Sequence, residues 1–147
     1  MFRIFSAPIL RLETLAIARL GQDLGLELTV RGAELAGSNG WSVYVLAPCS
    51  SFHNLSLAAL VWLSLLKLGR ETIRRPAWAA LIAGAALIIL LNASRILLMT
   101  PSEAQYQYWH DGMGRSLFVC LTFAAIALPT LLAMRSARQP QALATRR

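Results

Sequence analysis

The sequence predicts an all-α, multi-pass membrane protein with about three transmembrane helices, a surface amphipathic N-terminal helix and a short outer β-hairpin. This prediction rests on three long apolar segments, residues 50–68, 77–99 and 116–134. Their only charges are Lys67 and Arg95, each near the end of its segment. A membrane-spanning helix needs roughly 20 mostly apolar residues. A soluble protein with three such segments would expose too much apolar surface. We expect a single domain over residues 1–147.

The basic residues predict the orientation of these segments. The chain has 14 Lys and Arg, 7 Asp and Glu, and a net charge of +7. The basic residues cluster between the first two segments and after the third, at Lys67, Arg70, Arg74, Arg75, Arg135, Arg138, Arg146 and Arg147. Three spans place both clusters on one face, which is the positive-inside pattern of an inner (plasma) membrane protein. Residues 135–147 are then an unstructured cytoplasmic tail. No basic patch is left over for nucleic acid, so no nucleic-acid partner is expected.

Two elements are expected before the first span. Residues 8–24 mix apolar and charged positions with helical periodicity, and the charges near the middle favour an amphipathic helix on the membrane surface. A poorly ordered terminus is the alternative. Residues 26–46 alternate apolar and polar side chains around a Gly-rich turn at 36–40, which predicts a two-stranded hairpin on the outer face.

The remaining elements follow from the breaks between apolar segments. Pro48 ends the hairpin, and the first membrane helix begins at Cys49 or Ser50. The second and third membrane helices are separated by an outer loop over residues 103–115. The aromatic residues of this loop suit the lipid headgroup region.

Three residues with reactive or charged side chains are predicted to meet at the outer face. Cys49 lies at the start of the first span, and His110 lies six residues before the third. Arg95 is 18 residues beyond Ala77, about 27 Å of helical rise, and so lies near the outer end of the second span. A thiolate is a nucleophile whose pKa falls at a helix N-terminus, an imidazole can transfer protons, and a guanidinium can hold an oxyanion or carboxylate. This set is sufficient for acyl transfer.

Each of these residues also has an ordinary structural explanation. Cys49 could be a small buried side chain, Arg95 could reach to the interface, and His110 could be a solvated surface residue. His53 lies four residues after Cys49, on the same helical face. The spacing alone therefore leaves both Cys49–His53 and Cys49–His110 open as the reactive pair.

Three short boxes resemble the signature of a known family. Ala47-Pro48-Cys49-Ser50-Ser51, Asn92-Ala93-Ser94-Arg95-Ile96 and His110-Asp111-Gly112-Met113-Gly114 are similar to the Cys-Ser-Gly, Asn-x-x-Arg and His-x-x-x-Gly boxes of the exosortase/archaeosortase family. The resemblance covers roughly residues 13–134, and it is carried by the order, spacing and membrane placement of the boxes together.

The resemblance implies a membrane cysteine protease/transpeptidase with its active site on the outer (periplasmic) face. Cys49 would be the nucleophile, His110 the general acid/base, in preference to His53, and Arg95 the cation that orients the substrate or stabilises the transition state. The substrate would be an exported protein that ends in a short motif, a membrane helix and a basic tail. The lipid bilayer and another membrane subunit are the other partners considered, and no metal or organic cofactor is expected.

The sequence departs from the family pattern in two ways, and both support alternatives to an active transpeptidase. Ser51 stands where the family has glycine, and the several spans that usually precede the cysteine box are not seen, which predicts a compact form. The second hypothesis is therefore a catalytically reduced or non-catalytic accessory or scaffold protein of surface export. A thiol redox protein that uses Cys49 and Cys120 is disfavoured because the chain has no Cys-x-x-Cys.

Overall fold

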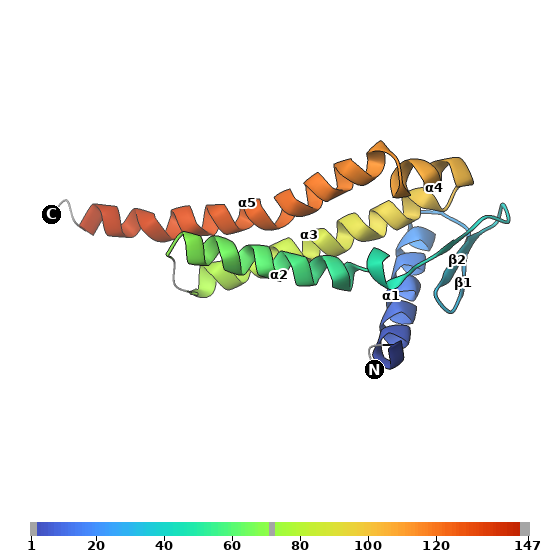
Figure 1. The fold of residues 1–147 in the computed structure, drawn as a ribbon, viewed down its shortest axis with the longest axis horizontal. Helices are drawn as coiled ribbons and strands as arrows, with labels where there is room; N and C mark the ends of the chain where they lie inside the picture. The colour runs from blue at the N-terminus through green and yellow to red at the C-terminus, as the bar shows by residue number, and fades with distance from the viewer. Residues whose placement is uncertain (1–2, 71–72, 145–147) are drawn as a thin grey trace.

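Three long helices that run side by side form the body of the molecule (Figure 1). The computed structural model describes residues 3–70 and 73–144. The long helices are α2 (Ser51–Leu68), α3 (Arg75–Met99) and α5 (Met113–Ala144). Each is long and apolar enough to cross a membrane, α5 over Met113–Ser136. The three predicted apolar helices are therefore confirmed as helices of spanning length.

The central helix is α3, which packs against both α2 and α5. Away from the sheet, the three helices share a core that includes Trp62, Leu66, Ile88 and Ile126. Trp62 Nε1 donates a hydrogen bond of 3.0 Å to the carbonyl oxygen of Ala77. This bond joins α2 to the first turn of α3 and fixes the two helices as an antiparallel pair.

The helix α1 (Arg3–Asp23) crosses the end of the bundle that also carries the sheet and α4 (Figure 1). The predicted helix over 8–24 is confirmed in type, but it begins at least five residues earlier and contains Pro8. Ile17 and Ala18 are buried in a core shared with the sheet and α3, whereas Leu12 and Leu15 are exposed. The helix therefore has one face on the protein and one apolar face open to its surroundings.

The segment after α1 forms three strands, so the prediction of a two-stranded hairpin is wrong. The strands β1 (Leu28–Arg31), β2 (Glu34–Gly37) and β3 (Ser42–Tyr44) form an antiparallel sheet in the order β1-β2-β3. Arg31 pairs with Glu34 across a two-residue turn, where Gly32 adopts a φ of 67°. Glycine reaches this left-handed region without strain. This tight turn adds the strand β2 before the Gly-rich turn at residues 36–40 that the composition indicated.

The predicted outer loop is largely helical, because α4 covers Glu103–His110. The Ser102 side chain caps the helix by accepting a 3.2 Å hydrogen bond from the backbone N–H of Gln105. A Ser-x-x-Gln sequence is a capping-box signal, so the sequence contained evidence for this helix. The short helix holds His110 at its C-terminal end.

The segment predicted to be an unstructured tail, residues 135–147, is also helical as far as Ala144. Residues 145–147 lie outside the described part of the chain. The helix continues past residue 134, where residues 135–139 contain no glycine or proline that would interrupt it.

Candidate active site

Cys49 lies in a short 3-10 turn, η1 (Ala47–Cys49), immediately before α2. Ser50 is the N-cap of α2 and has an extended backbone. The backbone N–H of Ser51 donates a 2.6 Å hydrogen bond to Glu13 Oε1 on α1. The prediction that Cys49 or Ser50 begins the membrane helix is thus wrong by one to two residues, and the Glu13 carboxylate, rather than the thiol, occupies the N-terminus of α2.

The thiol of Cys49 faces the imidazole of His110. The distance from Cys49 Sγ to His110 Nε2 is 3.7 Å, and the two residues are 61 positions apart in the chain. On the other side of the ring, His110 Nδ1 lies 2.9 Å from Asp111 Oδ1. When Nδ1–H donates to this carboxylate, Nε2 keeps its lone pair directed at the sulfur. Cysteine, imidazole and carboxylate therefore lie in the order used for nucleophile activation.

The alternative partner, His53, is exposed, and its side chain makes no hydrogen bond with any residue in the described part of the chain. Sequence spacing left the choice between the two histidines open. The tertiary structure places His110, rather than His53, beside the cysteine.

Tyr106 is a site residue that the sequence analysis did not identify. Its ring stacks on His110 with centroids 4.7 Å apart and an interplanar angle of 12°. Burial raises the pKa of Tyr106, the negative charges of Asp111 and of ionised Cys49 raise it further, and Arg95 opposes them. The phenol is therefore a neutral donor at physiological pH.

Arg95 reaches this region from α3 but does not hydrogen-bond to Cys49 or to the His110 side chain. Its Nε donates a 3.3 Å hydrogen bond to the carbonyl oxygen of Trp109, the residue before His110. Within the described residues the Arg95 side chain makes no other hydrogen bond and no ion pair. The guanidinium thus holds the α4 backbone at the histidine and leaves its terminal nitrogens unpaired.

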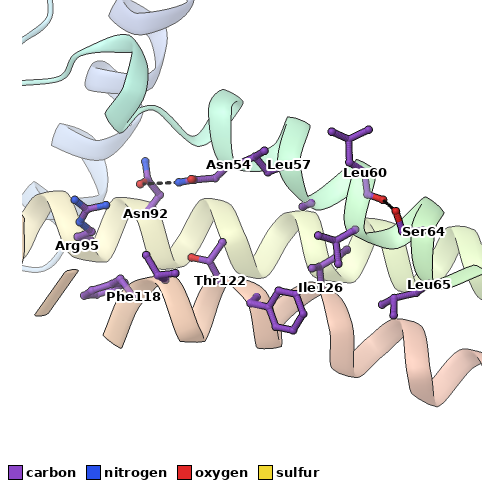
Figure 2. A pocket seen from close by; sticks show the side chains of 14 residues that line it. Asn54, Leu57, Leu60, Ser64, Leu65, Asn92, Arg95, Phe118, Thr122 and Ile126 are labelled. Carbon is purple, nitrogen blue, oxygen red and sulfur yellow. Dashed lines mark hydrogen bonds between the residues drawn. The ribbon is translucent and has the colours of Figure 1, made fainter. Parts of the chain in front are cut away.

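A buried amide network supports the cysteine from behind. Asn92 is 4% exposed, and its Nδ2 lies 2.9 Å from the carbonyl oxygen of Cys49, 3.2 Å from Ser51 Oγ and 3.3 Å from Glu13 Oε1. Its Oδ1 accepts a 3.4 Å hydrogen bond from Asn54 Nδ2 (Figure 2). One side chain therefore connects α1, η1, α2 and α3 at the position of the thiol.

Asn92 and Glu13 had only weak signals in the sequence. Asn92 is part of one of the three boxes that resemble the family, and Glu13 is one of the charged residues near the middle of the predicted amphipathic helix over residues 8–24. A polar residue inside an apolar segment is by default a functional hypothesis, and that rule would have found Asn92. No local pattern pairs it with Glu13, which is 79 positions away.

The described part of the chain contains no group of three or more His, Cys, Asp or Glu side chains placed to hold a metal ion. No protein-family model, curated protein or solved structure matches this chain. The resemblance to the exosortase/archaeosortase family therefore rests on the three sequence boxes.

Proposed function

We propose that this protein is a membrane-embedded cysteine peptidase/transpeptidase that cleaves C-terminal sorting signals of exported proteins and transfers them to a cell-surface acceptor. The observation that carries the proposal is the 3.7 Å approach of Cys49 Sγ to His110 Nε2, with Asp111 on the far side of the ring. The family resemblance supplies the substrate class. The orientation, with the site on the outer face of the plasma membrane, follows from the basic residues at the opposite end.

In this proposal the reaction proceeds through a thioester. His110 Nε2 accepts the thiol proton, and the Cys49 thiolate attacks the scissile carbonyl carbon to form a tetrahedral intermediate. The C–N bond then breaks, and His110 returns its proton to the leaving amine. The acceptor nucleophile, an amine or another surface group, attacks the thioester carbon, loses its proton to His110 and releases the thiol.

The other polar residues have supporting roles. Asp111 holds His110 in the tautomer that leaves Nε2 unprotonated, and the exposed carboxylate acts by orientation more than by charge. Arg95 would bind an anionic group of the substrate or the developing oxyanion with its terminal nitrogens. Asn92 keeps the Cys49 backbone in place through its 2.9 Å bond to the carbonyl.

The test is processing of a matched substrate in cells, followed as a mass shift of the exported protein. Cys49→Ala, Cys49→Ser and His110→Ala are expected to abolish processing, because each removes the nucleophile or its base. Arg95→Ala is expected to reduce it strongly. The matched controls are Cys120→Ala and His53→Ala, which remove the other thiol and the other imidazole and are expected to process normally.

A second measurement addresses the thiol directly. In a Cys120→Ala background, a membrane-impermeant thiol reagent should label Cys49 in intact spheroplasts more slowly after His110→Ala. Normal processing by Cys49→Ser, together with labelling that is indifferent to His110, would contradict the enzyme. That result would favour the non-catalytic scaffold of surface export.

A further inference from the structure

An apolar groove of about 620 Å³ lies between α2 and α5, and Asn92 and Arg95 of α3 also line it. In Figure 1 the ribbons of α2 and α5 separate toward the end that carries α4. Leu60 on α2 and Val119 and Phe123 on α5 line the groove and are exposed. The groove is therefore open to whatever surrounds the helices, which for spanning helices is lipid.

One end of the groove is polar and positively charged. Arg95 lies there with Asn54 and Asn92, whereas Leu65 and Ile126 lie toward the other end (Figure 2). The Nε of Arg95 is used by the Trp109 carbonyl, and a guanidinium has four further N–H donors on its terminal nitrogens. None of these has an acidic partner among the described residues. A charge at this depth in a membrane is costly unless an anion is paired with it.

The length of the groove distinguishes a lipid chain from a helix. Its lining runs from Asn54 to Leu65 on α2 and from Phe118 to Ile126 on α5, which is about 16 Å and about 12 Å of helical rise. That is roughly half of the 30 Å hydrocarbon core, the depth of one leaflet. A transmembrane helix would need the full depth. The volume also lies within the roughly 300–1,000 Å³ typical of small-ligand sites.

We infer that the groove binds one anionic lipid from the leaflet at the Cys49 end, with its phosphate on Arg95 and one acyl chain along α2 and α5. The guanidinium matches a phosphate in charge and in its paired N–H donors. Asn54, which donates to Asn92 through Nδ2, lines the groove at the same end. The inference rests on the membrane location proposed above and is independent of any reaction at Cys49.

The experiment is native mass spectrometry of the full chain in detergent, titrated with phosphatidylglycerol or with phosphatidylcholine of the same acyl chains. The wild-type chain is expected to retain one phosphatidylglycerol at a lipid concentration about tenfold lower than for phosphatidylcholine, because only the former leaves a net negative charge for Arg95. Arg95→Gln is expected to remove this preference. The exposed Arg115, absent from the groove, provides the control Arg115→Gln.

A second pair of variants tests the groove without changing charge. Val119→Trp fills the groove and is expected to weaken retention of both lipids about tenfold. Leu121→Trp, which adds the same side chain at a nearby exposed position outside the groove, is expected to have no effect. Circular dichroism establishes that each variant keeps its helical content.

Three results would overturn the inference. Equal retention of the two lipids by the wild-type chain would mean that the groove does not prefer an anionic lipid. Unchanged retention in both Arg95→Gln and Val119→Trp would place the lipid elsewhere. Binding of a synthetic 20-residue apolar helix that Val119→Trp abolishes and phosphatidylglycerol does not displace would make the groove a helix-docking surface instead.

Discussion

Glu13 connects the N-terminal helix to the site through two hydrogen bonds. Its Oε1 accepts from the Ser51 backbone N–H at 2.6 Å and from Asn92 Nδ2 at 3.3 Å. A carboxylate at a helix N-terminus is favoured by the helix dipole as well as by the free N–H groups. Ser51 itself is helical and buried and accepts from Asn92. The side chain that departs from the family glycine is therefore part of this network and causes no backbone strain.

Removal of the Glu13 carboxylate should destabilise the fold measurably. Glu13→Ala leaves the Ser51 N–H and one Asn92 N–H without this acceptor, which costs about 1–3 kcal/mol when such groups are buried. Denaturant or thermal unfolding in detergent measures the loss. Glu27→Ala is the control, because Glu27 is exposed. Equal stability of the two variants would contradict a structural role for Glu13.

Tyr106 should titrate above its ordinary pKa of 10.0, because burial and the negative charges of Asp111 and Cys49 disfavour phenolate. Its neutral form is favoured in the folded state, so the stabilisation is present below pH about 10 and is lost as the pH rises through the raised pKa. Ultraviolet titration of the phenolate should show a late component that Tyr106→Phe removes.

Two charge substitutions should move the Tyr106 pKa in opposite directions. Asp111→Asn removes a negative charge and should lower the pKa, whereas Arg95→Gln removes the opposing positive charge and should raise it. The exposed Tyr108 provides the control Tyr108→Phe, which should leave the late component in place. Loss of that component in Tyr108→Phe would contradict the assignment.

At the scale of the elements, α3 determines where the site residues meet. It carries Asn92 and Arg95 at one end, and it packs closely against α5 at Gly84. A Cβ atom at Gly84 would lie 2.6 Å from Ile126 Cδ1 and 3.0 Å from the Ala125 carbonyl oxygen. Close approach of backbones at small residues is how membrane helices gain packing contacts. The position of α5 along α3 therefore depends on this glycine.

Gly84→Val should push α3 and α5 apart and destabilise the bundle by about 1–3 kcal/mol, as overpacking of a core typically does. Thermal unfolding in detergent measures the effect. Ala83→Val is the matched control, since Ala83 is exposed on the same turn. If both variants unfold at the same temperature as the wild-type protein, the close α3–α5 contact is not a source of stability.

The whole molecule has two chemically different ends. The sheet, α1 and α4 lie at one end of the molecule, together with η1, which contains Cys49 (Figure 1). The last turn of α2 and the first turn of α3 lie toward the other end, on the side of the C-terminus (Figure 1). The basic residues of that second end include Lys67, Arg70, Arg74, Arg75 and Arg135. For helices that span a membrane, the positive-inside rule predicts that this basic end lies in the cytoplasm.

Single-cysteine labelling tests this orientation. In a Cys49→Ala, Cys120→Ala background, Ser38→Cys marks the sheet end and Ser136→Cys the basic end, and both positions are exposed. An impermeant thiol reagent should label Ser38→Cys in intact spheroplasts and Ser136→Cys only after the membrane is opened. The reverse pattern would contradict the orientation, and labelling of both before opening would contradict a spanning arrangement.

Sequence by itself determined the three long helices, the helical conformation of α1 and the segregation of charge. These features depend only on the length and composition of contiguous segments. A bilayer requires a spanning helix of roughly 20 mostly apolar residues, so such segments can be found from the sequence directly. Local signals for α4 were also present in its Ser-x-x-Gln cap. The sequence analysis missed one of the three strands. The strands β1 and β2 are only four residues long, and so short a segment shows too little apolar–polar alternation to be recognised as a separate strand.

Only the tertiary structure decided which groups meet. The pairing of Cys49 with His110 joins residues 61 positions apart, and the bond from Asn92 to Glu13 joins residues 79 apart. Such contacts depend on how α1 and α4 dock on the bundle, and no local pattern encodes that docking. The groove beside Arg95 likewise depends on how α2 and α5 pack on the same central helix and separate toward the end that carries α4 (Figure 1).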